Sequence, residues 1–255
     1  MQIDPEAYWN EQAGPRWILR PGERVLDIGC GCGSLCQDIA ELVGDSGRVV
    51  GLDISRPMVD HAQRTIDRPH VAFAAGDAQT YEFDPASFDA ALSRFGVMFF
   101  RDSVSAFANI ARALAPGGRV AFAVWQPIDR NPWITWPVAT IADLLPEDSE
   151  GPYGDDDAPG PFRFADPDRA KRVLGEAGFN DVDVTGFEET LVYPGSAEEI
   201  LATVSQVGPL SAALESLDEE TTKAALERVT AKIRELHRGG GLGFPGAWWL
   251  LTARR

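Results

Sequence analysis

A glycine-rich segment flanked by acidic residues is the part of the chain best suited to chemistry. Gly29, Gly31 and Gly33 alternate with small residues within RVLDIGCGCGS. Glycines at this spacing let the backbone turn sharply and approach a ligand with no side chain in between. Asp27 precedes the loop, where it could meet a cationic group. Asp53 follows Gly33 by twenty residues, where an acidic residue can accept hydrogen bonds from ribose hydroxyls.

The elements that must position this loop are a buried strand and a helix. Residues 25–28 form a short apolar run, as in a strand that is buried on both faces. Ser34 can cap a helix whose apolar residues then recur at helical spacing. A second apolar run over 48–53 predicts the next strand. Strand, glycine loop and helix together indicate the opening of a nucleotide-binding fold.

The rest of the first half continues this alternation. Further strands are expected over 71–75, 88–93 and 119–125, and a helix opens at Asp102. Regular alternation of strands with helices predicts a right-handed, doubly wound parallel sheet of the α/β class. A chain of 255 residues can bury the core of one such domain with cap insertions.

We expect a single domain over 1–255 with several functional parts. They are an N-terminal lid (1–20), a cofactor-binding core (21–125), a proline-rich cap loop (126–165), sheet completion (166–193 and 245–255) and a helical insert (194–244). For the N-terminal part, a lid and a hydrophobic staple on the core are both open interpretations.

Composition narrows the class of partners. The formal net charge is −16, which disfavours nucleic acids and anionic membranes because neutralising phosphate requires clustered Lys and Arg. No run approaches the roughly 18 apolar residues of a membrane span, and MQIDPEAYWN lacks signal-peptide character. We therefore expect a cytoplasmic protein that acts on a small molecule.

All three cysteines lie within residues 30–36, and this spacing raises the question of a metal. No second cluster exists and the histidines are scattered, so no metal site is expected. Cys30 and Cys32 also occupy loop positions that suit small residues, and Cys30 can offer its backbone to a ligand.

Polar and aromatic residues beyond the loop have two interpretations each. Asp77 can accept the amino hydrogens of an adenine or bind its own backbone in a turn. Ser93 ends a strand at the edge that lines the ligand crevice, and Arg94 can hold a carboxylate or pair with an acid. Trp133 and Trp136 can wall a substrate pocket or pack the 126–165 segment against the core.

Five segments together resemble the class I S-adenosylmethionine (SAM)-dependent methyltransferases. They are VLDIGCGCGS, VVGLDIS, AAGDAQ, FDAALSRFGVMFF and ALAPGGRVAFAVW, within about residues 24–125. The chain is similar to the type 11 branch, which includes quinone-biosynthesis methyltransferases. The resemblance implies SAM as the cofactor and a Rossmann-like, seven-stranded, mostly parallel sheet whose last strand is antiparallel.

The resemblance also assigns residues to the ligands. In the cofactor site it implies Asp27, Gly29, Gly31 and Ser93 at the methionyl part, Asp53 at the ribose, and Asp77 and Ala78 at the adenine. Cys30, Ile54, Met58 and Met98 complete the expected cofactor set, and Arg94, Phe95, Trp125, Trp133 and Trp136 form the expected acceptor set.

The expected reaction is methyl transfer to a small, partly apolar acceptor by in-line displacement. We expect the acceptor between residues 93–98 and the 126–165 segment. No catalytic residue is assigned, because the sulfonium methyl of SAM is already activated. The alternatives are an NAD-dependent oxidoreductase, disfavoured by Ser34 at the third glycine position, and a SAM-binding protein without turnover.

Overall fold

The computed structural model describes residues 19–146, 158–206, 208–238 and 241–255. Nearly all of the expected N-terminal lid lies outside the described residues. The chain divides into two compact units, the first formed by 1–124, 158–187 and 249–255 and the second by 125–157 and 188–248.

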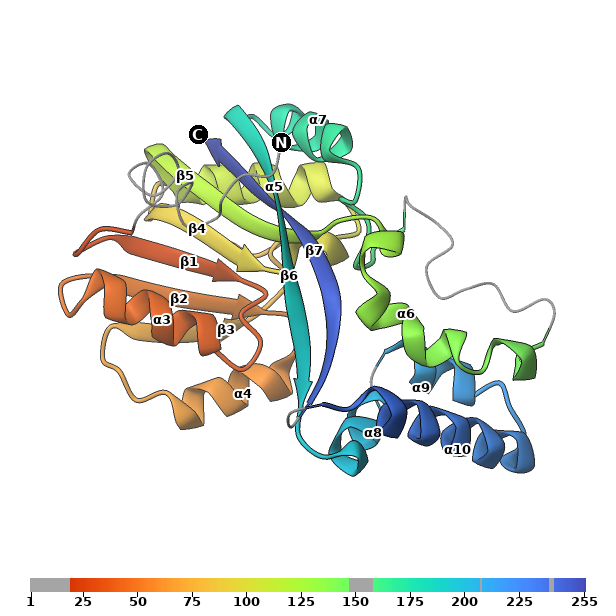
Figure 1. Cartoon of the computed structure of the whole chain (residues 1–255). Coiled ribbons are helices and arrows are strands. Elements are labelled where there is room, and N and C mark those ends of the chain that lie inside the picture. Colours follow the sequence, from red (N-terminus) through yellow and green to blue (C-terminus); the bar gives the residue numbers. More distant parts are fainter. Residues whose placement is uncertain (1–18, 147–157, 207, 239–240) are drawn as a thin grey trace. The chain divides into compact units, whose positions relative to one another are not determined.

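A seven-stranded sheet in the order β3-β2-β1-β4-β5-β7-β6 organises the fold (Figure 1). Its strands are β1 (Arg24–Ile28), β2 (Arg48–Asp53), β3 (Val71–Ala75), β4 (Phe88–Arg94), β5 (Leu114–Trp125), β6 (Asn180–Pro194) and β7 (Gly241–Arg254). Strands β1 to β5 pair in parallel, and β7 is antiparallel. The expected doubly wound, mostly parallel sheet is therefore confirmed.

Helices cover both faces of the sheet in the first unit. They are α3 (Ser34–Val43), α4 (Arg56–Thr65), the short η2 (Val97–Phe99), α5 (Ser103–Ala113) and α7 (Pro167–Glu176). The connections from β1 to β2 and from β2 to β3 run one way along the sheet, and the connection from β4 to β5, which contains α5, runs the other way. Right-handed connections therefore place α3 and α4 on one face and α5 on the other, as Figure 1 shows.

The helix starts test the predicted caps. Asp102 caps α5 by accepting a hydrogen bond from the backbone N–H of Ser105. The predicted cap at Ser34 is wrong, because the N-cap of α3 is Gly33 in a left-handed conformation, without a side-chain capping bond. Ser34 is instead the first helical residue, which frees its hydroxyl for another partner.

Apolar side chains fill the space on both faces of the sheet. Val25, Ile39 and Val49 belong to one buried cluster, between β1, β2 and α3. In another part of the first unit, the Phe107 ring stacks on Phe122 with a centroid separation of 5.5 Å. These layers bury the strands on both sides, as their continuous apolar runs predicted.

The second unit is mainly helical. Its helices are η3 (Ile128–Arg130), α6 (Pro132–Ala139), η4 (Ala142–Leu144), α8 (Ala197–Gln206), α9 (Pro209–Leu214) and α10 (Glu219–Leu236). Helix α6 occupies a segment expected to be a loop, and Pro132 fits there because a proline in the first turn loses no helical hydrogen bond. In the described part of the chain, no helix has the length and apolar character to cross a membrane.

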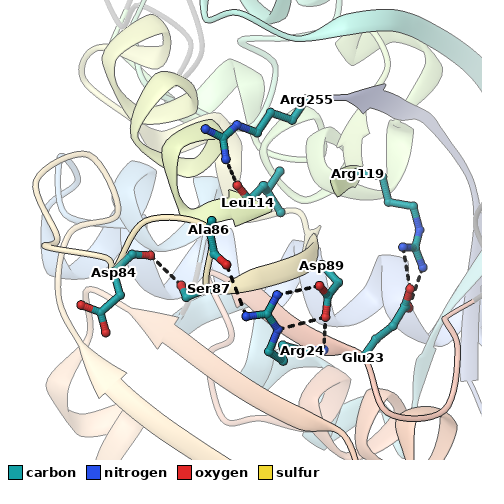
Figure 2. A network of polar contacts seen from close by, with 9 residues as sticks. All are labelled: Glu23, Arg24, Asp84, Ala86, Ser87, Asp89, Leu114, Arg119 and Arg255. Atoms are coloured by element: carbon teal, nitrogen blue, oxygen red, sulfur yellow. Dashed lines mark hydrogen bonds and ion pairs between the residues drawn. The ribbon is translucent and has the colours of Figure 1, made fainter. Parts of the chain in front are cut away.

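Ion pairs join the amino ends of β1, β4 and β5 (Figure 2). The Arg24 guanidinium donates to both carboxylate oxygens of Asp89, at 3.1 and 2.7 Å, and the Arg24 backbone N–H donates to the same carboxylate at 2.9 Å. Arg119 likewise donates to both oxygens of Glu23, at 2.9 and 2.7 Å.

The pair between Glu23 and Arg119 is the more buried of the two, with side chains 13% and 10% exposed. Burial raises the pKa of Glu23, but the bonds from Arg119 and from the Arg20 backbone N–H outweigh it. The pKa of Glu23 therefore lies below its ordinary value. Each of these four charges therefore has a partner of opposite sign within the chain.

Candidate functional site

A cavity of about 510 Å³ opens at the carboxyl ends of β1 to β4. Of the residues predicted to bind cofactor or acceptor, it is lined by Gly29, Gly31, Asp53, Ile54, Met58, Asp77, Ala78, Arg94 and Phe95. Asp27, Cys30, Ser93 and Met98 belong to the same unit but do not line the cavity. Trp125, Trp133 and Trp136 belong to the second unit.

The glycine loop touches the loop that follows β4. Gly29 and Gly31 have positive φ angles of 70° and 54°, which glycine adopts at little cost. A Cβ atom on Gly29 would lie 2.8 Å from Cα of Gly96. The close approach of these two loops therefore requires glycine at both position 29 and position 96. The sequence analysis did not identify Gly96 as part of the site.

Ser93 holds these two loops together. Its hydroxyl donates to the backbone oxygen of Ile28 at 2.6 Å and accepts from the backbone N–H of Gly96 at 3.2 Å. The residue is only 3% exposed. Its hydroxyl is therefore engaged by the backbone on both sides, and its predicted contact with a methionyl amino group stays a prediction.

Asp53 links the end of β2 to the glycine loop. One carboxylate oxygen accepts from the Gly31 N–H at 2.8 Å and the other from the Ser55 N–H at 2.8 Å. The sequence pattern indicated a ligand contact here but not this second task. Each carboxylate oxygen has further lone pairs, so Asp53 can still accept a hydrogen bond from a ligand hydroxyl.

Asp77 combines the two interpretations that the sequence left open. One of its oxygens accepts from the Gln79 N–H at 2.9 Å, which is the turn contact, and the side chain also lines the cavity. The turn fixes the carboxylate beside Ala78 at the end of β3. A single residue can therefore shape the turn and present an acceptor to a ligand.

Asp27 is a buried acid next to the cavity floor. It is 1% exposed, and its Oδ2 atom accepts a hydrogen bond from the Cys36 thiol at 3.2 Å. Its Oδ1 atom has no hydrogen-bond partner among the described residues. Burial raises the pKa of Asp27 to about 7, although the Cys36 thiol and the Arg94 guanidinium lower it; the Asp53 charge raises it further.

The chain leaving β4 carries a cation and a strained aromatic residue. Arg94 lines the cavity and donates to the Ser34 hydroxyl at 2.6 Å. That bond brings the guanidinium to the first turn of α3, the positive end of the helix dipole. Phe95 has a φ of +62°, which is rare for a bulky residue and tends to occur at functional sites.

Three large apolar side chains stand exposed around the cavity. Ile54, Met58 and Phe99 are 75%, 46% and 55% exposed, and all three line it. Exposed apolar groups gathered around a cavity mark a surface that an apolar part of a ligand can cover. The cavity therefore combines an apolar wall with carboxylate acceptors.

The expected acceptor tryptophans make packing contacts inside the second unit. The ring centroids of Trp125 and Trp133 lie 4.8 Å apart, and Trp136 stacks on Phe244 at 5.4 Å. These contacts favour packing as one role of the tryptophans. A contact with the acceptor stays a prediction.

Asn131 is a polar centre of the second unit that sequence reasoning missed. It is fully buried, and its amide nitrogen donates to the backbone oxygens of Gln126, Pro127 and Ala247 at 3.0 to 3.2 Å. Its amide oxygen accepts from the Ala247 N–H at 3.0 Å and from the Trp133 indole at 2.9 Å. One side chain therefore ties the start of this unit to β7.

The three cysteines are free thiols, with Cys30 and Cys36 buried and Cys32 exposed. The backbone N–H of Cys30 donates to the backbone oxygen of Leu52 at 3.2 Å. Its backbone amide thus joins the glycine loop to β2, and the expected contact of Cys30 with a cofactor stays a prediction.

Comparison with known proteins gives these features a context. Residues 25–118 match the sequence model described as a methyltransferase domain. Nocamycin O-methyltransferase of Saccharothrix syringae is 30% identical over 232 residues, which are 87% of this chain and 81% of that protein. Demethylmenaquinone methyltransferase of Beutenbergia cavernae is 38% identical over 134 residues, or 51% of this chain. The chain spans about half the length of this curated relative, 54%.

A solved structure agrees with the fold. Phosphoethanolamine N-methyltransferase 2 of Haemonchus contortus, in complex with SAM, has a TM-score of 0.55 and 19% sequence identity to this chain. The match covers 97% of this chain and 52% of that one. At this identity the likeness concerns the fold alone.

Proposed function

Because the chain belongs to the class I SAM-dependent methyltransferases, we propose that it transfers a methyl group from SAM to a small, partly apolar acceptor. When bound, the cofactor supplies a sulfonium methyl group that is already activated for transfer. The chain's task is then to bind, to orient and to exclude water. Relatives named for nocamycin and demethylmenaquinone support an acceptor of small-molecule size.

The residues around the cavity fit this cofactor. Gly29 and Gly31 line the cavity without a side chain, and so leave room for the methionyl part. Asp53 can accept from the ribose hydroxyls through its remaining lone pairs. Asp77, beside Ala78, presents a second acceptor for the adenine amino group.

Apolar residues complete the fit. Ile54 and Met58 line the cavity on the α4 side, and Phe99 lines it from η2. An adenine ring against such side chains would cover apolar surface that is otherwise exposed. A flat heterocycle with polar edges suits this mixture of apolar wall and carboxylate acceptors.

The observation that carries the proposal is that the glycine loop and the carboxylates of Asp53 and Asp77 line the same cavity. The loops after β1, β2 and β3 bring Gly29, Asp53 and Asp77 together, although the residues are 24 positions apart in each step. Such a crevice at the carboxyl ends of the strands is where open α/β sheets bind ligands.

Titration calorimetry with SAM and with NAD tests the cofactor. We expect SAM to bind and the variant Asp53→Asn to bind it about 10-fold to 100-fold more weakly, from one lost charged hydrogen bond. Asp45→Asn is the matched control, because this side chain is fully exposed and does not line the cavity. Tight binding of NAD with no heat from SAM would replace the proposal by the oxidoreductase alternative.

Turnover needs a separate measurement. Labelled SAM incubated with a panel of small acids, phenols and quinols should yield S-adenosylhomocysteine with at least one acceptor. Binding of SAM without turnover on any acceptor would favour the alternative of a SAM-binding protein.

A further inference from the structure

Asp27 is a buried ionisable group with few hydrogen-bond donors for its two carboxylate oxygens. Its Oδ1 atom has no hydrogen-bond donor among the described residues, and its Oδ2 atom has the Cys36 thiol. A thiol is a weak donor, and a carboxylate out of water needs strong donors on both oxygens. The geometry therefore disfavours the ionised form and leaves room for a proton on Oδ1.

The charged and titratable groups around Asp27 come from three elements. The Cys36 thiol faces it from α3, the Arg94 guanidinium acts on it from the end of β4, and the Asp53 carboxylate acts from the end of β2. Arg94 favours the ionised form, whereas Asp53 disfavours it. With burial, these groups place the pKa of Asp27 at about 7, so a modest change of nearby charge moves its proton.

The cofactor site supplies such a change of charge. Residues Ile28 and Gly29, which follow Asp27 directly, line the cavity, and so do both charged neighbours, Arg94 and Asp53. A cofactor with an ammonium, a sulfonium and a carboxylate carries a net positive charge. A net positive charge close to a buried carboxyl favours its ionised form.

We propose that Asp27 holds a proton in the cofactor-free protein and releases it to solvent when the cationic cofactor binds. The O–H bond of the carboxyl breaks and the buffer takes up the proton. This inference rests on the proposed function, because it needs SAM in the cavity. It makes cofactor affinity depend on pH through one side chain.

Calorimetry in buffers of different ionisation enthalpy measures the proton directly. With a pKa of about 7 in the cofactor-free protein, SAM binding should release about 0.9 proton at pH 6, about 0.5 at pH 7 and about 0.1 at pH 8. Affinity should weaken about tenfold from pH 8 to pH 6. 5′-Methylthioadenosine, which lacks the charged methionyl part, should bind without this release.

The variant Asp27→Asn isolates the carboxyl. When this variant binds SAM, the proton release assigned to Asp27 should be absent. Its affinity for SAM should also lose the part of the pH dependence that comes from Asp27. The α-amino group of SAM also titrates near pH 8, so wild type and variant are compared between pH 6 and 7, where this group is almost fully protonated in free SAM. Asp77→Asn is the matched control, since it removes a carboxylate from the cavity and should keep the wild-type proton release.

Infrared spectroscopy tests the wild type without any substitution. The carbonyl band of a protonated carboxyl group should be present at pH 6 and should disappear when SAM binds. SAM binding with equal proton release in wild type and Asp27→Asn, or without loss of such a band, would overturn the inference alone. Absence of SAM binding to the wild type would overturn the proposed function and this inference together.

Discussion

The two edges of the same sheet treat their charges in opposite ways. At the amino edge, Arg24 and Asp89 make a two-pronged pair, and Glu23 and Arg119 make another (Figure 2). At the carboxyl edge, one oxygen of Asp27 has no partner in the part of the chain that the structure describes, and Arg94 donates to a neutral hydroxyl.

The contrast follows from what each edge does. Charges that only support the fold are best paired within the chain, because an unpaired buried charge costs several kcal/mol. Charged side chains that bind a ligand must keep hydrogen-bonding capacity available before the ligand binds. The exposed Ile54, Met58 and Phe99 around the cavity show the same pattern for apolar surface. The unpartnered Asp27 oxygen and these exposed apolar side chains therefore lie at the edge where we propose that the ligand binds.

Breaking the buried pair at the amino edge should have the largest effect on stability. Arg119→Met leaves the Glu23 carboxylate buried without its guanidinium, which should cost about 3–5 kcal/mol of unfolding free energy. Urea denaturation measures the loss. Under conditions where the variant is folded, its affinity for SAM should equal that of the wild type; a weakened affinity would show that the two edges are not independent.

A side chain at Gly29 in the glycine loop should reduce both the stability of the protein and its affinity for the cofactor. Gly29→Ala puts a Cβ atom 2.8 Å from Gly96 at a φ of +70°, so we expect a loss of about 3 kcal/mol of stability and of cofactor binding. Gly44→Ala is the control, since its φ is +66° and nothing lies within 4 Å of the added atom. Because ψ of Gly44 is −177°, this backbone conformation is also strained for alanine and the change should cost about 1–3 kcal/mol, but it should leave SAM affinity unchanged.

The unpartnered acid at the carboxyl edge should make stability depend on pH. The pKa of Asp27 rises from 3.8 to about 7 on folding, so the folded state binds the proton more tightly. Its contribution to stability is complete below pH 3.8 and is lost as the pH rises through 7. Between pH 5.5 and 8, wild type should lose about 2 kcal/mol relative to Asp27→Asn. Parallel stability curves in urea would contradict this.

The more exposed pair at the amino edge should have the smallest effect. The Arg24 and Asp89 side chains are 41% and 33% exposed, so solvent screens their attraction. Asp89→Asn keeps an acceptor for the Arg24 backbone N–H and should cost about 1 kcal/mol. A loss as large as that of Arg119→Met, measured by the same denaturation, would refute the ranking by burial.

Local patterns predicted the glycine loop and the acids that end successive strands. The glycine loop and the acids at strand ends follow from spacing along the chain, because parallel strands bring their carboxyl ends to one edge. Contacts between distant segments gave no such signal. In the sequence alone, Gly96 resembles any loop glycine, because its contact with Gly29 exists only when β4 pairs with β1. The bond from Gly31 to Asp53 likewise depends on the register of β1 against β2.

Pairs far apart in sequence were likewise out of reach. Glu23 and Arg119 are separated by 96 positions, and nothing in their neighbours marks one for the other. Ser34 was predicted to cap α3, but Gly33 holds the N-cap position and the Ser34 hydroxyl accepts from Arg94, sixty positions away. In each case a tertiary contact replaced the local preference that the sequence displayed.

The position of Asn131 in the sequence affects its chemical stability against deamidation. Asparagine loses ammonia chiefly when the following backbone nitrogen attacks the side chain and closes a succinimide ring. The following residue is Pro132, whose nitrogen carries no hydrogen and cannot take that route. This amide, which donates to three backbone oxygens, is therefore shielded from spontaneous conversion to aspartate, a change that would place a negative charge against all three.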